Sequence, residues 1–349
     1  MKNISNYFKR LLIISSIIAF TSCSKDSPSE PEIDGVKLND AFAQAGQIMG
    51  IKSLAVAKDG VIIKEQYFNT GGPDKTHDVR SVTKSVTGIL IGIAIDKGYL
   101  KSPDQTIGEF ISPLVPGMSS EKENIKMRDL LTMCIGFSGN ELANVSEYNN
   151  WIISPNQVQT LVNRALVAQP GQIFNYNSAA LHLLSVIITR ATNMKTQDFA
   201  EQYLFDPLGI TQYYWETDNQ GYNNGAAGLN ITPHDMIKIG QLILNRGEYN
   251  GQRIVSPGWV DQSTVTQIST NIAQKYGPGY GFCWWTGQND KGNYAFANGW
   301  GGQFIFVIPS LKLVVSATNN WSGYSESNAD NDWVNTIDLI MGSIIPSFH

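Results

Sequence analysis

Residues 80–88 read Arg80-Ser81-Val82-Thr83-Lys84-Ser85-Val86-Thr87-Gly88 and open an apolar run that continues to Gly98. Apolar residues recur in this run at helical spacing, which predicts a buried helix with Gly98 as its C-cap. Ser81 then lies near the first turn, and Lys84 follows on the same face of the helix at i,i+3.

The placement of this serine and lysine suits nucleophilic catalysis. A helix N-terminus offers free backbone N–H groups and a positive potential, both of which stabilise a developing oxyanion. Burial disfavours the charged form of Lys84, and a neutral amine beside the Ser81 hydroxyl can accept its proton. A bare Ser-x-x-Lys also occurs by chance in plain amphipathic helices, so the pattern needs support from elsewhere in the chain.

Composition indicates a globular protein with a substantial core. The chain has 349 residues, of which 42% are hydrophobic and 10% aromatic, and its formal net charge is −5. There is no basic stripe, so no nucleic-acid partner is expected. No Cys-x-x-Cys, His-Glu-x-x-His or EF-hand pattern occurs, so neither a metal nor another cofactor is expected.

The N-terminus predicts export. Residues 1–22 combine three basic residues with an apolar stretch over 11–20 that is too short to span a bilayer, as in a signal peptide. Phe20-Thr21-Ser22-Cys23 resembles a bacterial lipobox, which would make Cys23 a lipid-modified N-terminus. The alternative is an ordinary cleaved signal peptide. We expect an outer-membrane lipoprotein facing the periplasm or the cell surface, with residues 23–36 as lipidated cysteine and flexible tether and residues 37–349 as one domain.

The rest of the chain predicts an α+β fold. Strands over 54–57 and 61–63 flank an Asp59-Gly60 turn, and four strands follow much later over 280–285, 294–297, 303–308 and 312–318. Helices are expected over 36–49, 127–133, 156–168, 179–191, 196–205, 233–245 and 331–345. The early hairpin and the late strands are expected to share one antiparallel sheet with flanking helices, into which about residues 100–240 are inserted as a helical region.

Two further motifs follow Ser81-x-x-Lys84 in order. Tyr176-Asn177-Ser178 lies on a loop before a helix, and Trp300-Gly301-Gly302 precedes a strand. This order resembles the β-lactamase-related serine hydrolases, which include class C β-lactamases, D-alanyl-D-alanine peptidases, and esterases and amide hydrolases of the same fold. Similarity to the family extends over about residues 38–345, with further landmarks at 130–133, 199–209 and 299–303.

The resemblance implies a role for each motif residue. Ser81 would be the acylated nucleophile, with Lys84 easing its deprotonation and Tyr176 acting as base and proton shuttle. Which of Lys84 and Tyr176 is the operative base stays open. The backbone N–H groups of Ser81 and Gln303 would form the oxyanion hole, and Ser178 stands where class C enzymes have asparagine.

The third motif bears on the substrate. True β-lactamases have a lysine where this chain has Trp300, and that lysine helps to bind the substrate carboxylate. A tryptophan followed by Gly301 and Gly302 is similar to the esterases of the family, and its ring offers an apolar wall for an acyl or alkyl group. The alternative is that Trp300 only packs. Asn298 and Gln303 are further candidates for hydrogen bonds to substrate.

Other residues that could carry chemistry are assigned to structure. The four histidines, His77, His182, His234 and His349, are expected to be structural or solvated, which argues against a Ser-His-Asp scheme. Aromatic residues at 213–215 and 284–285 either floor a substrate cleft or pack. Cys134 and Cys283 are expected to be core thiols, although a disulfide between them stays possible in an oxidising compartment.

The sequence therefore predicts an exported serine hydrolase, penicillin-binding-protein-like in fold, that cleaves esters or amides through an acyl-enzyme. Carboxylesterase-like activity is favoured by Trp300. A β-lactamase or D-Ala-D-Ala peptidase is the first alternative, and an Arg or Lys reaching the site from elsewhere would favour it. A binding or sensor module without turnover is the second. The expected partners are a small ester, amide or peptide substrate and, through the lipid, a membrane; the sequence does not predict an oligomeric state.

Overall fold

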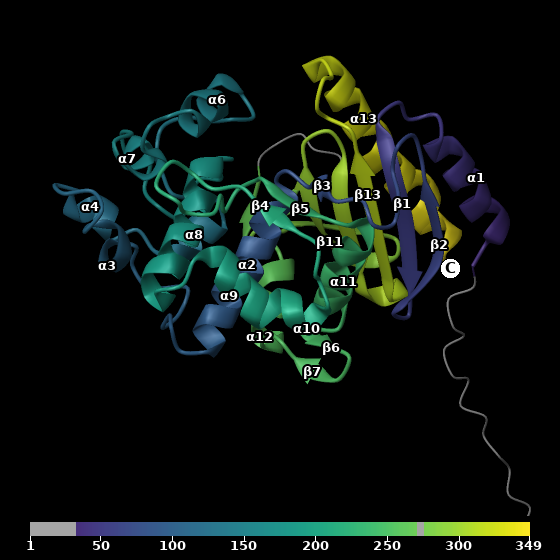
Figure 1. The fold of residues 1–349 in the computed structure, drawn as a ribbon, viewed down its shortest axis with the longest axis horizontal. Coiled ribbons are helices and arrows are strands. Elements are labelled where there is room, and N and C mark those ends of the chain that lie inside the picture. The colour runs from purple at the N-terminus through teal and green to yellow at the C-terminus, as the bar shows by residue number, and fades with distance from the viewer. Residues whose placement is uncertain (1–32, 271–275) are drawn as a thin grey trace, which may run out of the picture.

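The structure, a computed structural model, describes residues 33–270 and 276–349 and is built around one antiparallel sheet (Figure 1). The strand order is β2-β1-β13-β12-β11-β10-β9-β8. The strands are β1 (Ile51–Lys58), β2 (Val61–Tyr67), β8 (Ile268–Ser269), β9 (Gly279–Tyr280), β10 (Trp285–Asn289), β11 (Gly292–Gly299), β12 (Gln303–Ile308) and β13 (Leu313–Asn319). The expected sheet of N- and C-terminal strands is confirmed, since β1 pairs with both β2 and β13.

Burial along the strands follows from what covers each face. Every residue of β12 and β13 is buried, as expected for strands with helices on both faces. The edge strand β2 instead alternates between exposed and half-buried positions. Asp59 and Gly60 both have positive φ angles, 52° and 83°, and so provide the tight turn between β1 and β2.

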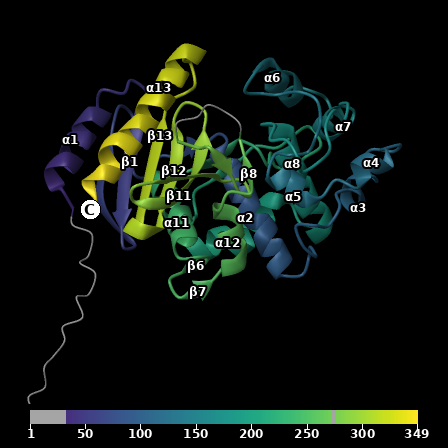
Figure 2. The ribbon, with the colours of Figure 1, turned by 180° about the vertical axis from the view of Figure 1, so that it is seen from behind.

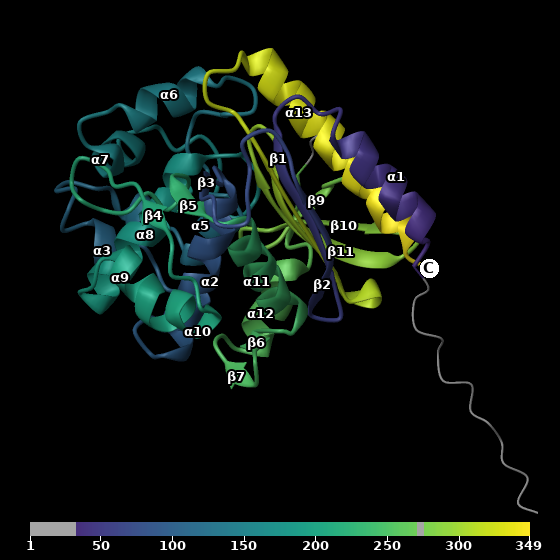
Figure 3. The same cartoon turned by 45° about the vertical axis from the view of Figure 1, so that its right-hand side comes forward.

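Helices cover both faces of the sheet. On one face α1 (Gly35–Ala45) and α13 (Glu326–Leu339) lie side by side, as the turned view shows (Figure 3). On the other face lie α2 (Val82–Asp96) and α11 (Pro233–Leu244), with α12 (Pro257–Thr264) against α2 (Figure 2). The α11 helix begins with a capping box in which Thr232 and Asp235 hydrogen-bond each other's backbone N–H groups.

A helical region packs beside the sheet around α8 (Ser178–Thr192). It contains α3 (Gly108–Ile111), α4 (Ser120–Glu123), α5 (Met127–Leu131), α6 (Ser146–Ile152), α7 (Gln157–Val162), α9 (Thr196–Ala200), the π-helix η1 (Glu201–Phe205) and α10 (Asp206–Leu208). Because α2 contacts both α8 and the sheet, it joins the two parts of the fold.

The remaining elements are short. Two small sheets are made by β3 (His77–Asp78), β5 (Leu229–Ile231) and β4 (Tyr214–Trp215), and by β6 (Glu248–Tyr249) and β7 (Gln252–Arg253). Short helical turns are η2 (Pro309–Leu311), η3 (Ile340–Ile344) and η4 (Ile345–Ser347), the last two extending α13 toward the C-terminus.

Several predicted elements differ from the structure. The last helix begins at Glu326 rather than near residue 331, and the first ends at Ala45 rather than at Met49. The strand expected over 280–285 is two strands, because Cys283 adopts a φ of 64° and the chain reverses so that Tyr280 pairs with Trp285. The helix expected over 156–168 ends at Val162. The helix from Thr196 does not stop at Asp206-Pro207 but continues to Leu208 through the π-helical turn η1, in which the Asp206 N–H donates to the Glu201 carbonyl.

Two predicted boundaries also move. The α11 helix packs on β12 and β13, so the helical insertion ends before residue 233 rather than near 240. Ile33 bridges Phe348, and Asp34 caps α1, so the folded part already includes residues assigned to the tether. The predicted signal peptide, Cys23 and most of the tether lie outside the described residues. Within the described residues, none of the helices is both long and apolar enough to span a bilayer.

Candidate active site

Ser81 is the N-cap residue of α2. The backbone N–H groups of the next two residues are already used, since Val82 donates to the Val79 carbonyl and Thr83 to the Arg80 carbonyl, both at 3.1 Å. Fewer free N–H groups are therefore available at this helix end than expected. The N–H of Ser81 itself remains as the candidate oxyanion donor. Arg80 adopts a φ of 51°, an unusual conformation for a non-glycine residue, directly before the serine.

Lys84 lies one turn into α2, beneath Ser81. It is only 2% exposed, and its Nζ lies 2.7 Å from Ser81 Oγ and 2.9 Å from the Ala226 carbonyl oxygen. Burial lowers the pKa of Lys84 to about 7, with Arg80 acting in the same direction and Glu141 opposing it. The amine is thus partly neutral near neutral pH, as a base for the serine requires.

Tyr176 reaches the same point from the loop before α8. Its ring centroid lies 5.1 Å from Lys84 Nζ, and the ring stacks on Trp285 at a centroid distance of 6.1 Å. Burial raises the pKa of Tyr176, although a hydrogen bond with Ser81 and the charge of Arg80 oppose the change. The structure therefore brings Ser81, Lys84 and Tyr176 together, with the phenol in its protonated form.

Ser178, the third residue of the tyrosine motif, is buried at the start of α8. It donates through its backbone N–H to Glu141 Oε1 at 2.7 Å and through its hydroxyl to Glu141 Oε2 at 2.6 Å. Burial raises the pKa of this carboxyl group, while Lys84 and the two hydrogen bonds from Ser178 lower it. Sequence reasoning missed Glu141, because it lies in a loop without periodicity or a recognisable motif.

The third motif forms the turn between β11 and β12. Gly301 and Gly302 have φ angles of 78° and 95°, and a Cβ on Gly302 would lie 2.6 Å from Asn319 Nδ2, so this turn requires glycine. A Cβ on Gly299 would lie 2.4 Å from the Val79 carbonyl oxygen. The end of β11 is thereby held against the segment that leads into Ser81.

The two candidates for substrate hydrogen bonds near this turn differ. The Gln303 side chain is fully buried, donating to the Asn319 carbonyl and accepting from its N–H, both at 3.0 Å, so only its backbone N–H is left for a role in the site. Asn298 instead lines the pocket, where its Oδ1 accepts from Trp333 Nε1 at 2.6 Å.

A pocket of about 360 Å³ opens in front of Ser81. Its wall comes from both parts of the fold and includes five aromatic residues, Tyr148, Tyr176, Trp285, Trp300 and Trp333. The charged residues that line it are Arg80, Glu141, Glu326 and Asp330. Among the described residues of the wall, the three acidic side chains therefore outnumber the one cationic side chain.

Trp300 and Arg80 are both anchored in this wall. Trp300 donates its indole N–H to Asp330 Oδ1 at 3.1 Å. The Arg80 guanidinium lies 4.4 Å from the Trp321 ring centroid and 5.9 Å from that of Trp300, and its Nη1 is 3.4 Å from Asp78 Oδ2. Arg80 was part of the stretch that predicted the helix, but nothing in the sequence placed its side chain in the pocket.

The histidines lie outside the pocket wall. His77 is half-buried, and burial lowers its pKa to about 4 with a contribution from Lys52; His349 is the last residue of the sequence. His182 Nε2 lies 3.0 Å from Asp218 Oδ2, and His234 Nε2 lies 2.6 Å from Glu65 Oε2.

The remaining candidates mostly pack. Trp215 is buried and donates to the Asn224 carbonyl, and Tyr213 packs against Phe205 with tilted rings, so of the two aromatic stretches only Trp285 reaches the pocket. Cys134 and Cys283 are buried free thiols, as expected. The described residues contain no group of three or more His, Cys, Asp or Glu that could hold a metal ion.

Comparison with known families agrees with this geometry. The model of the family described as Beta-lactamase matches residues 38–337. The chain belongs to the β-lactamase family. It is thus an enzyme of the β-lactamase-related serine hydrolases, which confirms the predicted family, and the mixed helix and antiparallel-sheet fold agrees with it.

One curated relative and two solved structures show what this chain is similar to. A 6-aminohexanoate-dimer hydrolase of Paenarthrobacter ureafaciens is 25% identical over 342 residues, covering 88% of this chain and 84% of the relative. The solved structure of a putative 6-aminohexanoate-dimer hydrolase from Bacillus anthracis has a TM-score of 0.69 at 22% identity, covering 87% of this chain and 82% of the other. EstCE1, a hydrolase with promiscuous acyltransferase activity, has a TM-score of 0.68 at 16% identity and coverage of 86% and 98%.

Proposed function

We propose that the protein hydrolyses ester or amide bonds through an acyl-enzyme formed on Ser81. The observation that carries the proposal is the buried amine of Lys84, whose Nζ lies 2.7 Å from the Ser81 hydroxyl oxygen. A serine hydroxyl is a weak nucleophile until a base at hydrogen-bond distance removes its proton.

Lys84 is the base in this proposal. Its lowered pKa, about 7, leaves a neutral amine that can accept the Ser81 proton while Ser81 Oγ attacks the carbonyl carbon. The raised pKa of Tyr176 disfavours a phenolate, so Tyr176 serves as a proton donor to the leaving group and recovers a proton from the Lys84 ammonium. The backbone N–H groups of Ser81 and Gln303 stabilise the oxyanion, and water then releases the acyl group from Ser81.

The pocket supports esters or amides with an uncharged acyl group as substrates. Its aromatic wall suits apolar groups, and Trp300 stands where a β-lactamase has a carboxylate-binding lysine. The relative from Paenarthrobacter ureafaciens is named for hydrolysis of a 6-aminohexanoate dimer, which makes a linear amide a second substrate class to test. Carboxylesterase-like activity remains the leading proposal.

Arg80 is the observation that favours the alternative, a β-lactamase or D-Ala-D-Ala peptidase. It supplies a cation beside Ser81 from outside the third motif. Its pairing with Asp78 and the three carboxyl groups in the same wall weaken its attraction for a substrate carboxylate. A sensor that acylates without turnover is distinguished from both enzymes by kinetics.

A side-by-side assay tests the proposal. Hydrolysis of a short-chain p-nitrophenyl ester, a linear 6-aminohexanoate dimer and a chromogenic cephalosporin is measured for the protein from residue 24 onward and for Ser81→Ala. We expect ester turnover that falls by about 10³-fold or more in the variant, with little cephalosporin turnover. Dominant cephalosporin turnover would favour the alternative, and a single burst without recycling would favour the sensor.

We also propose export and lipidation at Cys23, on the basis of the N-terminal sequence. The test is the full chain expressed in a Gram-negative host with labelled fatty acid. We expect label and membrane fractionation that Cys23→Ala abolishes; release of an unlabelled soluble form by the unchanged chain would instead indicate an ordinary signal peptide.

A further inference from the structure

We propose that the buried pair His182–Asp218 positions Lys84, acting through the loop of residues 223–226. The inference rests on the proposed function, since it assigns a purpose to the pair only if Lys84 is the base. His182 and Asp218 would be positioning residues, because neither lines the pocket in front of Ser81.

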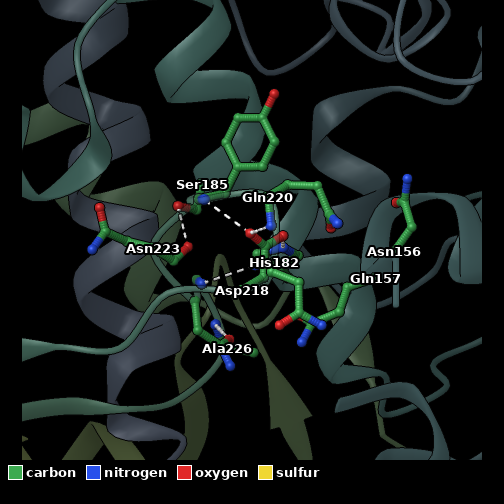
Figure 4. Close-up of polar contacts among 12 residues, drawn as sticks. Asn156, Gln157, His182, Ser185, Asp218, Gln220, Asn223 and Ala226 are labelled. Atoms are coloured by element: carbon green, nitrogen blue, oxygen red, sulfur yellow. Dashed lines mark hydrogen bonds and ion pairs between the residues drawn. The ribbon is translucent and has the colours of Figure 1, made fainter. Parts of the chain in front are cut away.

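The pair lies inside the protein, with His182 on α8 and Asp218 in the segment that follows β4. His182 is completely buried, and Asp218 is 8% exposed. Asp218 Oδ2 lies 3.0 Å from His182 Nε2, while Asp218 Oδ1 accepts the backbone N–H groups of Gln220 and Tyr222, each at 2.9 Å (Figure 4). Burial raises the pKa of Asp218, but the contacts with His182 and with these two N–H groups lower it by more, so the net change in the pKa is downward.

The other ring nitrogen of His182 holds the loop. The backbone N–H of Gly225 points to His182 Nδ1 at 3.4 Å. A neutral imidazole satisfies both partners only with its proton on Nε2, which donates to Asp218 and leaves Nδ1 as the acceptor. Asp218 therefore selects the tautomer that can bind the loop.

Gly225, which contacts His182, directly precedes Ala226, which contacts Lys84. Gly225 is fixed by His182 at its N–H and by Thr87 at its carbonyl oxygen, 2.9 Å from Thr87 Oγ1. The next carbonyl, that of Ala226, accepts from Lys84 Nζ at 2.9 Å. A Cβ on Gly225 would lie 2.6 Å from the Leu181 carbonyl oxygen, so the loop rests directly on α8.

This contact matters because Lys84 has few partners to fix it. Its Nζ binds one hydroxyl, that of Ser81, and one carbonyl, that of Ala226. A shift of the Ala226 carbonyl would let the flexible lysine side chain leave the line of the Ser81 proton, and misplacement of a reacting group by about 1 Å can cost about 10²-fold in rate.

Asp218→Asn is the sharpest test. The oxygen of the new amide is held by the two N–H donors of Gln220 and Tyr222, so its NH₂ group faces His182. The ring must then accept at Nε2 and carry its proton on Nδ1, where it opposes the Gly225 N–H. The change in shape is minimal, and the effect on the loop comes from the tautomer.

Two measurements are made on this variant. Nitrogen-15 NMR of the imidazole reports the tautomer, and stopped-flow acylation by a p-nitrophenyl ester reports the work of Lys84. We expect the proton to move to Nδ1 and acylation to slow by about tenfold or more with KM within about twofold. The control is Ile187→Ala, which makes a cavity on a different face of the same helix, about 140° around from His182, and should lower Tm while leaving acylation within about twofold.

Other outcomes overturn the inference. Acylation in Asp218→Asn as fast as in Ile187→Ala, with the tautomer changed, would show that the pair does not position Lys84. A loss of acylation with the proton still on Nε2 would contradict the tautomer argument. If Asp218→Asn does not fold, Thr87→Val removes the second anchor of Gly225, and we expect the same slowing of acylation with the proton still on Nε2. Failure of the proposed function is separate, because it appears as activity that survives in Ser81→Ala.

Discussion

At the scale of single residues, the charge of Lys84 links catalysis to stability. The pKa of Lys84 is about 7 in the folded protein against 10.5 for an ordinary lysine, so between these values unfolding takes up a proton. Raising the pH from 7 to 10 therefore stabilises the folded protein by up to about 1.4 kcal/mol per pH unit through this group. Lys84→Met lacks this pH dependence. Urea unfolding of both proteins at several pH values should show that the free energy of unfolding of the unchanged protein rises relative to that of the variant as pH rises. Parallel curves would contradict the lowered pKa.

Glu141 is a second residue whose charge should affect the pH dependence of activity, because it raises the pKa of Lys84. Its carboxyl group opposes the lowering of the Lys84 pKa. As the pH is lowered, Lys84 takes up a proton and activity should fall. Glu141→Gln keeps partners for Ser178 but removes the charge, so the midpoint of kcat/KM should move to lower pH. Glu121→Gln, an exposed carboxylate on α4, is the control and should leave the midpoint unchanged. A shift to higher pH in Glu141→Gln would be the opposite of the expected result.

Single residues also show which parts of the site could be predicted from the sequence. Helical spacing predicts that Ser81 and Lys84 share one face, and the resemblance to the family implies that Tyr176 joins them; the structure places all three in contact distance. Glu141 and the Ala226 carbonyl could not, because one comes from an irregular loop and the other is a backbone group. Their positions follow from tertiary packing, which leaves no local pattern.

At the scale of elements, α2 depends on two glycines that let it approach its neighbours. A Cβ on Gly92 would lie 2.3 Å from Trp259 Cδ1, and one on Gly88 would lie 3.0 Å from Cys283 Cβ. Gly92→Ala should therefore destabilise the protein by about 1–3 kcal/mol despite the better helix propensity of alanine. Gly258→Ala in α12 meets no atom within 4 Å and should be neutral or stabilising by up to about 1 kcal/mol. Urea unfolding compares them, and equal stabilities would refute the packing argument.

Elements with strong periodicity were predictable, and those defined by long-range contacts were not. The buried helix after Ser81, the Asp59-Gly60 hairpin and the capped α11 all have local signals and agree with the structure. The reversal at Cys283 has none, because an apolar aromatic run fits one strand as well as two until its pairing partners are known.

At the scale of the whole molecule, the sheet joins segments from both ends of the chain. Strand β1 lies between β2 and β13, and the helices α1 and α13 cover it from one side. The opening reactions that expose the amides of β1 and β13 to exchange should therefore have the same high free energy. The free energy of opening should be lower for amides of the exposed segment around α6. Native-state hydrogen exchange measures both. Exchange of β1 well before β13 would show that the N-terminal hairpin unfolds independently.

The active site is also a product of the whole fold. Ser81 and Lys84 come from the helix that joins the two parts, Tyr176 from the helical region, and Trp300 from the sheet. The most direct test of the central claim is the intact mass of the protein quenched during turnover of a p-nitrophenyl ester, followed by peptide mapping. We predict one added acyl group on Ser81, absent in Ser81→Ala and about 10³-fold slower to form in Lys84→Met. An adduct on another residue, or one that forms equally fast without Lys84, would contradict the account.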